Sequence, residues 1–388
     1  MLKESRINSG LFFLTDICRS STKTYLMDIE VKKETAPVKK NFDFVDTIRC
    51  ISMFGIVFEH SAVLWGTKYS TMGDTFLQVI TMQFWKFATI AFFLIGGFLI
   101  NYKFTEYTPG QYLARRFKNT IKPWLFWIFF LVIATLIQRI IVASRGGDAV
   151  FINGPVAYFA EQFRYILFES SFWFILNFLI CISILLIFKK YLYKLWFGLI
   201  WAAVSLVYSV NLYFEWFVTH HSAALFGFVF YLWLGVYLNR YYEQVINYIK
   251  KIKWTYVGLV NILFFILSCL EVIYLAKHGS KDEYNTLRIS NILYSLSMFV
   301  LLLKMGSVKF IDKNLEPRKT TFGIYLLHQI LIIRLIPEIF KWDKWNVATF
   351  TVTENILYSI LRFALVYGLS FLLTRLLLKT KLKWTVGG

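Results

Sequence analysis

The 388-residue sequence is poor in charged residues and in cysteine. Asp, Glu, Lys and Arg make up only 17% of the chain, against about 25% in ordinary soluble domains, so the composition excludes an ordinary soluble protein. The four cysteines have no metal-ligand spacing, and we expect them to be small core residues. They are Cys18, Cys50, Cys181 and Cys269. The sequence therefore predicts no metal site and no disulfide framework.

The sequence also lacks the common cofactor motifs. It contains no phosphate-binding Gly-rich loop ending in Lys-Ser/Thr, no dinucleotide fingerprint and no G-x-S-x-G nucleophile elbow. These absences argue against an ATP-driven pump and a serine esterase. We expect no permanently bound cofactor.

The sequence is rich in apolar and aromatic residues. They account for 57% and 20% of the chain, and they gather in runs of about twenty residues, the length that spans a bilayer. We therefore expect an all-α, polytopic membrane bundle of about ten transmembrane helices. The expected spans are 43–65, 80–100, 121–143, 171–188, 195–212, 222–238, 254–275, 289–304, 321–338 and 355–377.

The net charge of +19 is explained by orientation rather than by a nucleic-acid partner. The cations gather in alternate short connections between spans, and the positive-inside rule then places both termini in the cytosol. We expect residues 1–41 to be a basic, disordered cytosolic tail, 42–378 to be the membrane domain, and 379–388 to be a second cytosolic tail. Met27 offers an alternative start, so the native product need not contain residues 1–26.

The first span, within residues 41–64, carries four polar interruptions at Asp46, Arg49, Glu59 and His60. Ionisable residues in a span are costly and indicate a functional site. Arg49 and His60 are eleven residues apart, within about 20° of three helical turns, so they share a face about 16.5 Å apart along the axis. Asp46 stands three residues before Arg49 and can pair with it. Glu59 points about 100° away from His60.

Further candidates lie outside the first span. Arg115, Arg116 and Lys118 form a basic stretch before the third span that can bind phosphates, although basic residues also flank most cytosolic helix ends.

Other candidates lie within the later spans. Tyr325 and His328 share a helix face; an intramembrane His is either satisfied by a neighbouring helix or part of a site. Trp173 fits an interfacial aromatic belt most simply. Asn177 is either a packing contact or a site residue.

Several short motifs, taken in order, resemble the acyltransferase 3 family of integral-membrane acyltransferases. The D-T-I-R stretch ending at Arg49, followed after ten residues by His60, is the most specific of them. The others are F-F-L-I-G-G-F-L, R-F-K-N-T-I-K-P, S-F-W-F-I-L, the stretch 226–240 and G-I-Y-L-L-H. Together they cover about residues 42–378. Gly96 stands where the family commonly has Ser, and Asn119 where a second Arg is common.

The resemblance implies O-acyl transfer, usually of acetyl from acetyl-CoA, to a hydroxyl of a cell-envelope carbohydrate such as O-antigen, capsule, exopolysaccharide or a lipid-linked glycan. It also implies a bacterial cytoplasmic-membrane location. We expect no appended extracytoplasmic hydrolase-like domain. The partners expected are an acyl-CoA donor, a glycan acceptor and the lipid bilayer.

The residues suggest how such a reaction would run. His60 suits a general base because the unperturbed imidazole pKa of about 6.5 lies close to working pH. Arg49 and the basic stretch would hold the donor phosphates, with Asp46 in support, and Glu59 would assist His60 or bind the acceptor. Two other classes stay open: a transporter or exporter of glycans or small anions, with Arg49, His60 and His328 along its path, and a noncatalytic scaffold for glycan assembly.

Overall fold

The computed structural model describes residues 42–65, 67–145, 154–340 and 347–388, and within them the chain forms helices and no strand. The expected all-α fold is confirmed. The α-helices are α2 (Asp43–Ser61), α3 (Met72–Gln83), α4 (Ala88–Glu106), α5 (Pro109–Arg116), α6 (Lys122–Ser144), α8 (Pro155–Phe168), α9 (Trp173–Ile187), α10 (Leu195–Phe214), α11 (Val229–Arg240), α12 (Tyr242–Lys251), α13 (Trp254–Lys277), α14 (Ile289–Met305), α15 (Lys309–Leu315), α16 (Pro317–Ile330), α17 (Ile336–Ile339) and α18 (Val352–Leu378).

Each of the ten expected spans contains a helix, but not every helix is long and apolar enough to cross a membrane. In the part of the chain described, six stretches are, or eight if each of two bent helix pairs counts as one span. Helix α11 has only 12 residues, and α2 carries Asp46, Arg49 and Glu59 within 19 residues. The protein is a multi-pass membrane protein, and the count of ten stays a prediction.

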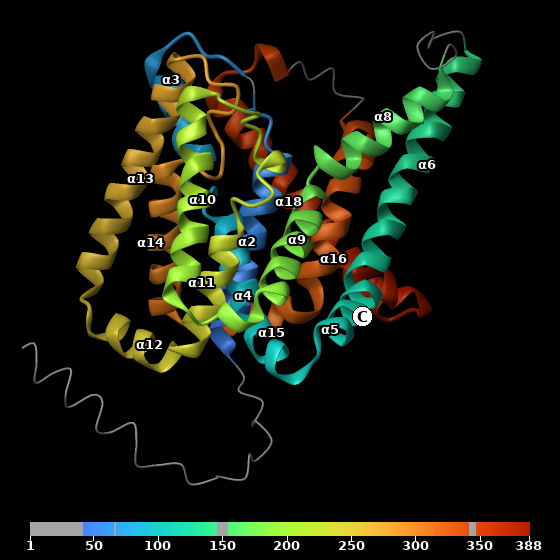
Figure 1. Cartoon of the computed structure of the whole chain (residues 1–388). Helices are drawn as coiled ribbons and strands as arrows, with labels where there is room; N and C mark the ends of the chain where they lie inside the picture. The colour runs from blue at the N-terminus through green and yellow to red at the C-terminus, as the bar shows by residue number, and fades with distance from the viewer. Residues whose placement is uncertain (1–41, 66, 146–153, 341–346) are drawn as a thin grey trace, which may run out of the picture. The chain divides into compact units, whose positions relative to one another are not determined.

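Helix α2 runs through the middle of the bundle (Figure 1), where it packs against α4, α16 and α18. Its apolar residues Met53 and Val57 are at most 1% exposed and belong to a core cluster of buried residues. The polar residues of α2 are therefore held inside protein rather than in lipid, which is how a membrane helix tolerates them.

Helices α4 and α11 pack backbone to backbone, as small residues at a membrane-helix contact allow. A Cβ atom built on Gly97 would lie 1.9 Å from the Leu232 carbonyl oxygen, and one on Gly235 would lie 2.0 Å from the Leu94 oxygen. Only glycine allows this approach at either position.

Two π-helical turns interrupt long helices, and each lies just before a proline. They are η1 (Phe117–Ile121), followed by Pro123 at the start of α6, and η4 (Leu331–Leu335), followed by Pro337 in α17. Proline has no N–H to donate to the preceding turn, and a wider turn is one way to accommodate that loss. Such turns often lie at functional sites.

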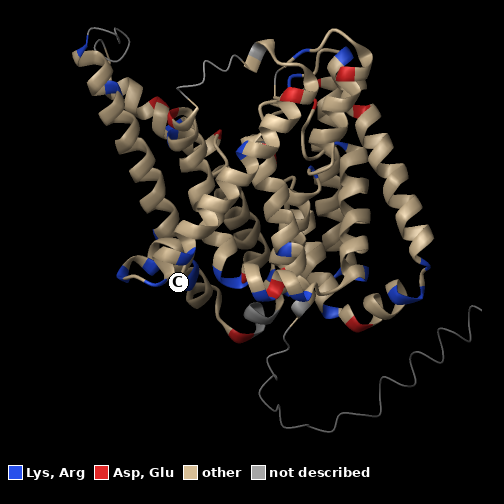
Figure 2. Cartoon of the chain, turned by 180° about the vertical axis from the view of Figure 1, so that it is seen from behind, with Lys and Arg blue, Asp and Glu red and all other residues tan. Residues whose placement is uncertain are grey.

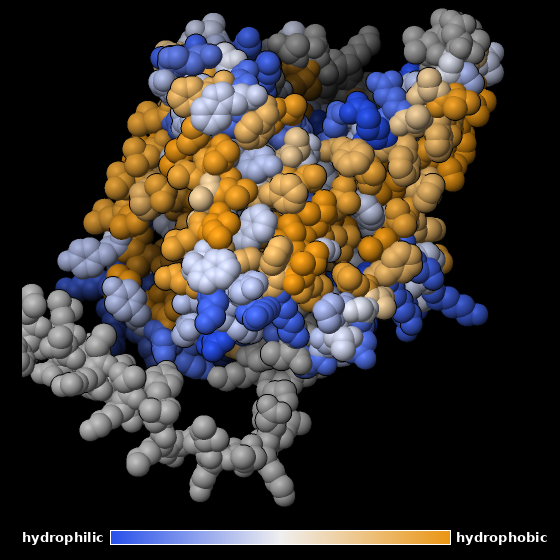
Figure 3. Space-filling view, in the orientation of Figure 1, coloured by the Kyte–Doolittle hydropathy of each residue, from blue (hydrophilic) through white to orange (hydrophobic). Residues whose placement is uncertain are grey.

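Hydrophobic side chains cover the flank of the described bundle between two more hydrophilic ends (Figure 3), as a membrane-spanning protein requires. Many Lys and Arg residues gather at the end that holds the C-terminus (Figure 2). The positive-inside rule assigns that end to the cytosol, and the orientation stays a prediction. Cys50, Cys181 and Cys269 are buried and free, as expected; Cys18 and the whole of residues 1–41, including Met27, lie outside the described residues.

Candidate active site

The face of α2 that carries Arg49 and His60 borders two neighbouring cavities. Arg49 and Met53 line a larger cleft near the basic end, His60 lines a small pocket deeper in the bundle, and Ile56 lines both. The spacing of four, three and four residues is that of one helix face. The two cavities share three walls, Ile56, Phe174 and Tyr325.

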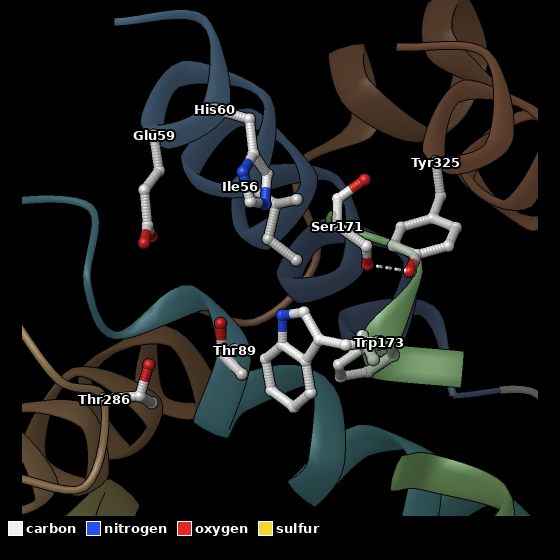
Figure 4. A pocket seen from close by; sticks show the side chains of 9 residues that line it. Ile56, Glu59, His60, Thr89, Ser171, Trp173, Thr286 and Tyr325 are labelled. Atoms are coloured by element: carbon white, nitrogen blue, oxygen red, sulfur yellow. Dashed lines mark hydrogen bonds between the residues drawn. The ribbon is translucent and has the colours of Figure 1, made fainter. Parts of the chain in front are cut away.

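The small pocket holds the imidazole of His60. Its volume is about 20 Å³, room for about one water molecule, so larger groups have to displace side chains. Figure 4 shows the imidazole of His60 and the indole of Trp173 directed into it from opposite sides. The Tyr325 hydroxyl donates a hydrogen bond to the Ser171 carbonyl oxygen. The pocket is lined by Ile56, Glu59, His60, Thr89, Ser171, Trp173, Phe174, Thr286 and Tyr325.

His328 lies next to His60, with 5.5 Å between the ring centroids. Its Nδ1 is 2.5 Å from the Tyr325 carbonyl oxygen and 3.3 Å from that of Ile324. A carbonyl only accepts, so Nδ1 carries a proton and, in the neutral ring, Nε2 carries a lone pair. Nε2 is buried without a hydrogen-bond partner among the described residues. His328 therefore presents an unused acceptor beside His60.

Glu59 forms an ion pair that the sequence did not reveal. Its Oε1 is 2.5 Å from Nζ of Lys86, whose side chain is 3% exposed against 15% for Glu59. Lys86 lies in the break between α3 and α4, and its ammonium also lies 4.9 Å from the centroid of the Trp65 ring. Glu59 thus reaches the His60 pocket with its charge balanced, although it points away from His60 on α2.

The larger cleft combines a basic opening with apolar walls. It has a volume of about 340 Å³ and is lined by Arg49, Arg116 and Arg318 among the charged residues described. Asp46 accepts from Arg49 at 2.9 Å and from Arg318 at 2.5 Å, so one carboxylate positions two guanidinium groups. Its apolar walls include Met53, Ile56, Phe92, Ile95, Leu99, Phe174, Ile175 and Phe178.

Comparison with known proteins shows the family of the chain. A family model described as an acyltransferase domain matches residues 42–375. The chain belongs to the acyltransferase 3 family. It is also 24% identical over 312 residues to a protein of Bacillus subtilis (strain 168) named "Putative membrane-bound acyltransferase YfiQ", covering 74% of this chain and 80% of that protein. No solved structure matches the chain.

In the structure of this acyltransferase 3 protein, only one of the three residues expected to bind the donor lines the cleft. Arg116 lines the cleft, and its Nε donates to the Tyr112 hydroxyl at 2.7 Å. Arg115 is exposed and lies 4.2 Å from the centroid of the Tyr107 ring, and Lys118 is exposed as well. Of the three, Arg116 is the one that lines the same cleft as Arg49.

Two other candidates take buried positions. Trp173 is 6% exposed and lines the His60 pocket, which does not fit a lipid-facing aromatic belt. Asn177 is 1% exposed; its Nδ2 donates to the Ala224 carbonyl at 3.4 Å and its Oδ1 accepts from Cys181 at 3.3 Å. These contacts favour the packing interpretation of Asn177.

Arg318 and Lys86 were missed, for different reasons. Arg318 is the second residue of α16 and follows a basic connection, where nothing in the sequence distinguishes it from its neighbours. Lys86 offered a signal, because it is the only charged residue in the apolar run 84–100, and a lone charge in such a run needs a partner.

The C-terminal residues complete the cleft. The short helix η6 (Lys381–Val386) packs against α6, α16 and α18. Val386 is fully buried, Trp127 donates from its indole to the Thr385 carbonyl oxygen at 2.8 Å, and Gly387 lines the cleft. The expected C-terminal tail is thus packed against the membrane domain.

Proposed function

We propose that this membrane acyltransferase moves an acetyl group from acetyl-CoA to a hydroxyl of a cell-envelope carbohydrate, with His60 as general base. One observation supports the proposal above all. Arg49 and His60 lie on one face of α2 and line two cavities that share walls, so a phosphate-binding group and a base lie along one path.

The cleft suits the donor. Its three arginines, Arg49, Arg116 and Arg318, can bind the phosphates of CoA at the basic end. The apolar walls suit the uncharged arm that carries the thioester, and His60 lies about 16.5 Å farther along α2 than Arg49. The nucleotide would stay at the cytosolic opening while the thioester reaches the base.

In the reaction, the acceptor oxygen attacks the thioester carbonyl carbon while a nitrogen of His60 takes the hydroxyl proton. The tetrahedral intermediate collapses, the C–S bond breaks, and the proton passes from the His60 imidazolium to the departing CoA sulfur. An ester and CoA thiol result. His328, whose ring lies 5.5 Å from that of His60 and whose Nε2 is buried with no partner among the described residues, is a positioning residue for the base.

The test uses purified protein in detergent with labelled acetyl-CoA and cell-envelope glycans. Transfer of label to the glycan is expected for the wild type and is expected to fall at least about 100-fold in His60→Ala, in line with a general base. Protection against heat by acetyl-CoA should persist in that variant, because the phosphate contacts remain. Near-normal transfer by His60→Ala would remove the base assignment. Movement of glycan across vesicles without a covalent change would instead support a transporter.

A further inference from the structure

The His60 pocket has a polar side that it does not share with the larger cleft. Glu59, Thr89 and Thr286 line the pocket but not the cleft. They come from α2, from α4 and from the connection between α13 and α14. Figure 4 shows all three on the opposite side of the pocket from Tyr325, which lines both cavities. A donor that arrives through the cleft therefore leaves this polar side to the other substrate.

Thr286 comes from the end of the bundle where that other substrate is expected. The connection between α13 and α14 lies at the end opposite the C-terminus (Figure 1), and the positive-inside rule assigns the C-terminal end to the cytosol. The connection nevertheless reaches into the bundle, because Thr286 is only 4% exposed. A segment from the expected outer end thus lies beside the base.

Buried hydrogen bonds hold the backbone of Thr286 in place. Its carbonyl oxygen accepts from Nδ2 of Asn291 at 2.7 Å, and Oδ1 of Asn291 accepts from Nε2 of Gln83 at 2.8 Å. The side-chain oxygen of Gln83 in turn accepts from the guanidinium of Arg288. Asn291, Gln83 and Arg288 are all fully buried. Three polar side chains from two chain segments thus fix the position of one threonine.

Arg288 ties this network to the rest of its surroundings. Its guanidinium also donates to the carbonyl oxygens of Asn285 at 3.1 Å and Ser268 at 2.8 Å. It lies 3.7 Å from a carboxylate oxygen of Glu271. A buried ion pair is weak evidence for stability, and ionisable residues inside a membrane protein indicate function by default. The segment that Arg288 fixes contributes one side chain to the described lining of the His60 pocket, that of Thr286.

The size and charge of the pocket indicate what Thr286 contacts. A volume of about 20 Å³ admits one group of the size of water, and the hydroxyl that His60 deprotonates is such a group. A second hydroxyl on the neighbouring carbon of the acceptor then meets the walls. Threonine hydroxyls both donate and accept hydrogen bonds. Because Glu59 is paired with Lys86, the polar side is balanced in charge and suits a neutral hydroxyl.

We propose that Thr286, together with Thr89, selects an acceptor hydroxyl that has a second hydroxyl beside it, by forming hydrogen bonds to that second hydroxyl. The two threonines are specificity-determining residues. Arg288, Gln83 and Asn291 are positioning residues that act through Thr286. The proposal rests on the proposed function, because it takes His60 to act on an acceptor hydroxyl.

The experiment measures how two small alcohols inhibit the acetylation of cell-envelope glycan by purified protein in detergent. The probes are cis-1,2-cyclohexanediol, which has two neighbouring hydroxyls, and cyclohexanol, which has one. Either alcohol inhibits whether it is acetylated itself or only occupies the pocket. The readout is the inhibition constant of the diol divided by that of cyclohexanol. A variant that is merely less well folded loses active protein and leaves this ratio unchanged.

We expect Thr286→Val to raise the ratio about 3- to 10-fold, the effect of losing about one hydrogen bond. Thr89→Val should raise it as well, and it keeps the test sound if Thr286→Val does not fold. Thr286→Ser retains the hydroxyl and should keep the ratio of the wild type. Thr255→Val is the matched control, because Thr255 is an exposed threonine of α13 outside the pocket lining.

Asn291→Leu tests the positioning residues. It removes the hydrogen bond to the Thr286 carbonyl oxygen and should raise the ratio about threefold or more. A ratio that rises in Thr286→Val but not in Asn291→Leu would overturn the positioning role.

An unchanged ratio in both threonine variants, with glycan acetylation intact, would overturn the specificity role and leave the proposed function standing. A change in only one of the two would restrict that role to the residue concerned. Absence of glycan acetylation in the wild type would overturn the proposed function, and the specificity role with it. The two failures therefore give different results.

Discussion

The ion pair between Glu59 and Lys86 provides the sharpest test of how the His60 pocket is held. We expect Lys86→Met to destabilise the protein strongly, because it leaves the Glu59 carboxylate without its partner in a largely buried place. The double variant Lys86→Met with Glu59→Gln removes both charges and should recover most of the lost stability. Lys68→Met is the control, because Lys68 is exposed.

The magnitude follows from the geometry. At 2.5 Å and an effective dielectric constant of about 20, the two charges attract by about 7 kcal/mol before desolvation is counted. Removing one partner of a buried pair typically costs about 3–5 kcal/mol, whereas replacing both is often close to neutral. We therefore expect a loss of about 3–5 kcal/mol for Lys86→Met and of at most about 1–2 kcal/mol for the double variant.

Unfolding by sodium dodecyl sulfate, followed by tryptophan fluorescence, measures these differences. If the effects of the two substitutions add, so that the double variant is less stable than either single one, the pair does not exist as described. Activity provides a separate measurement. Because Glu59 lines the His60 pocket, the double variant should recover stability without recovering full acetyl transfer.

Two further predictions concern packing and donor binding. Gly97→Ala should lower the free energy of unfolding by at least about 1–3 kcal/mol, because the new Cβ meets the backbone of α11. Gly258→Ala on α13 is the control: with open space around it, it should be neutral or stabilising by about 0.5–1 kcal/mol. Arg318→Gln should raise KM for acetyl-CoA about 3- to 10-fold at nearly constant kcat, a modest effect because its side chain is 49% exposed. Lys313→Gln is the control, because Lys313 is exposed, and it should leave KM unchanged. Equal KM values in the two variants would remove Arg318 from the proposed donor site.

The polar face of α2 could be predicted because it depends on one helix alone. Arg49 and His60 lie on one helix, so the helical period places them on one face wherever that helix packs. The Asp46–Arg49 pair follows from the same local rule.

Contacts between distant segments could not be predicted in this way. Arg318 joins Asp46 from 272 residues away, and Lys86 joins Glu59 from 27 residues away. The basic stretch is a second example. The sequence did not distinguish Arg115, Arg116 and Lys118 from one another, and in the structure only Arg116 of the three lines the cleft.

The sequence by itself determined that this is an all-helical membrane protein and which face of α2 carries the polar groups, because hydropathy and helical period act over a few turns of a single chain segment. The tertiary structure decided which charges balance them, how the larger cleft and the His60 pocket share walls, and that Arg139 and Arg334 line a separate pocket. A cavity is the space left between packed helices, so its shape depends on segments that only folding brings together.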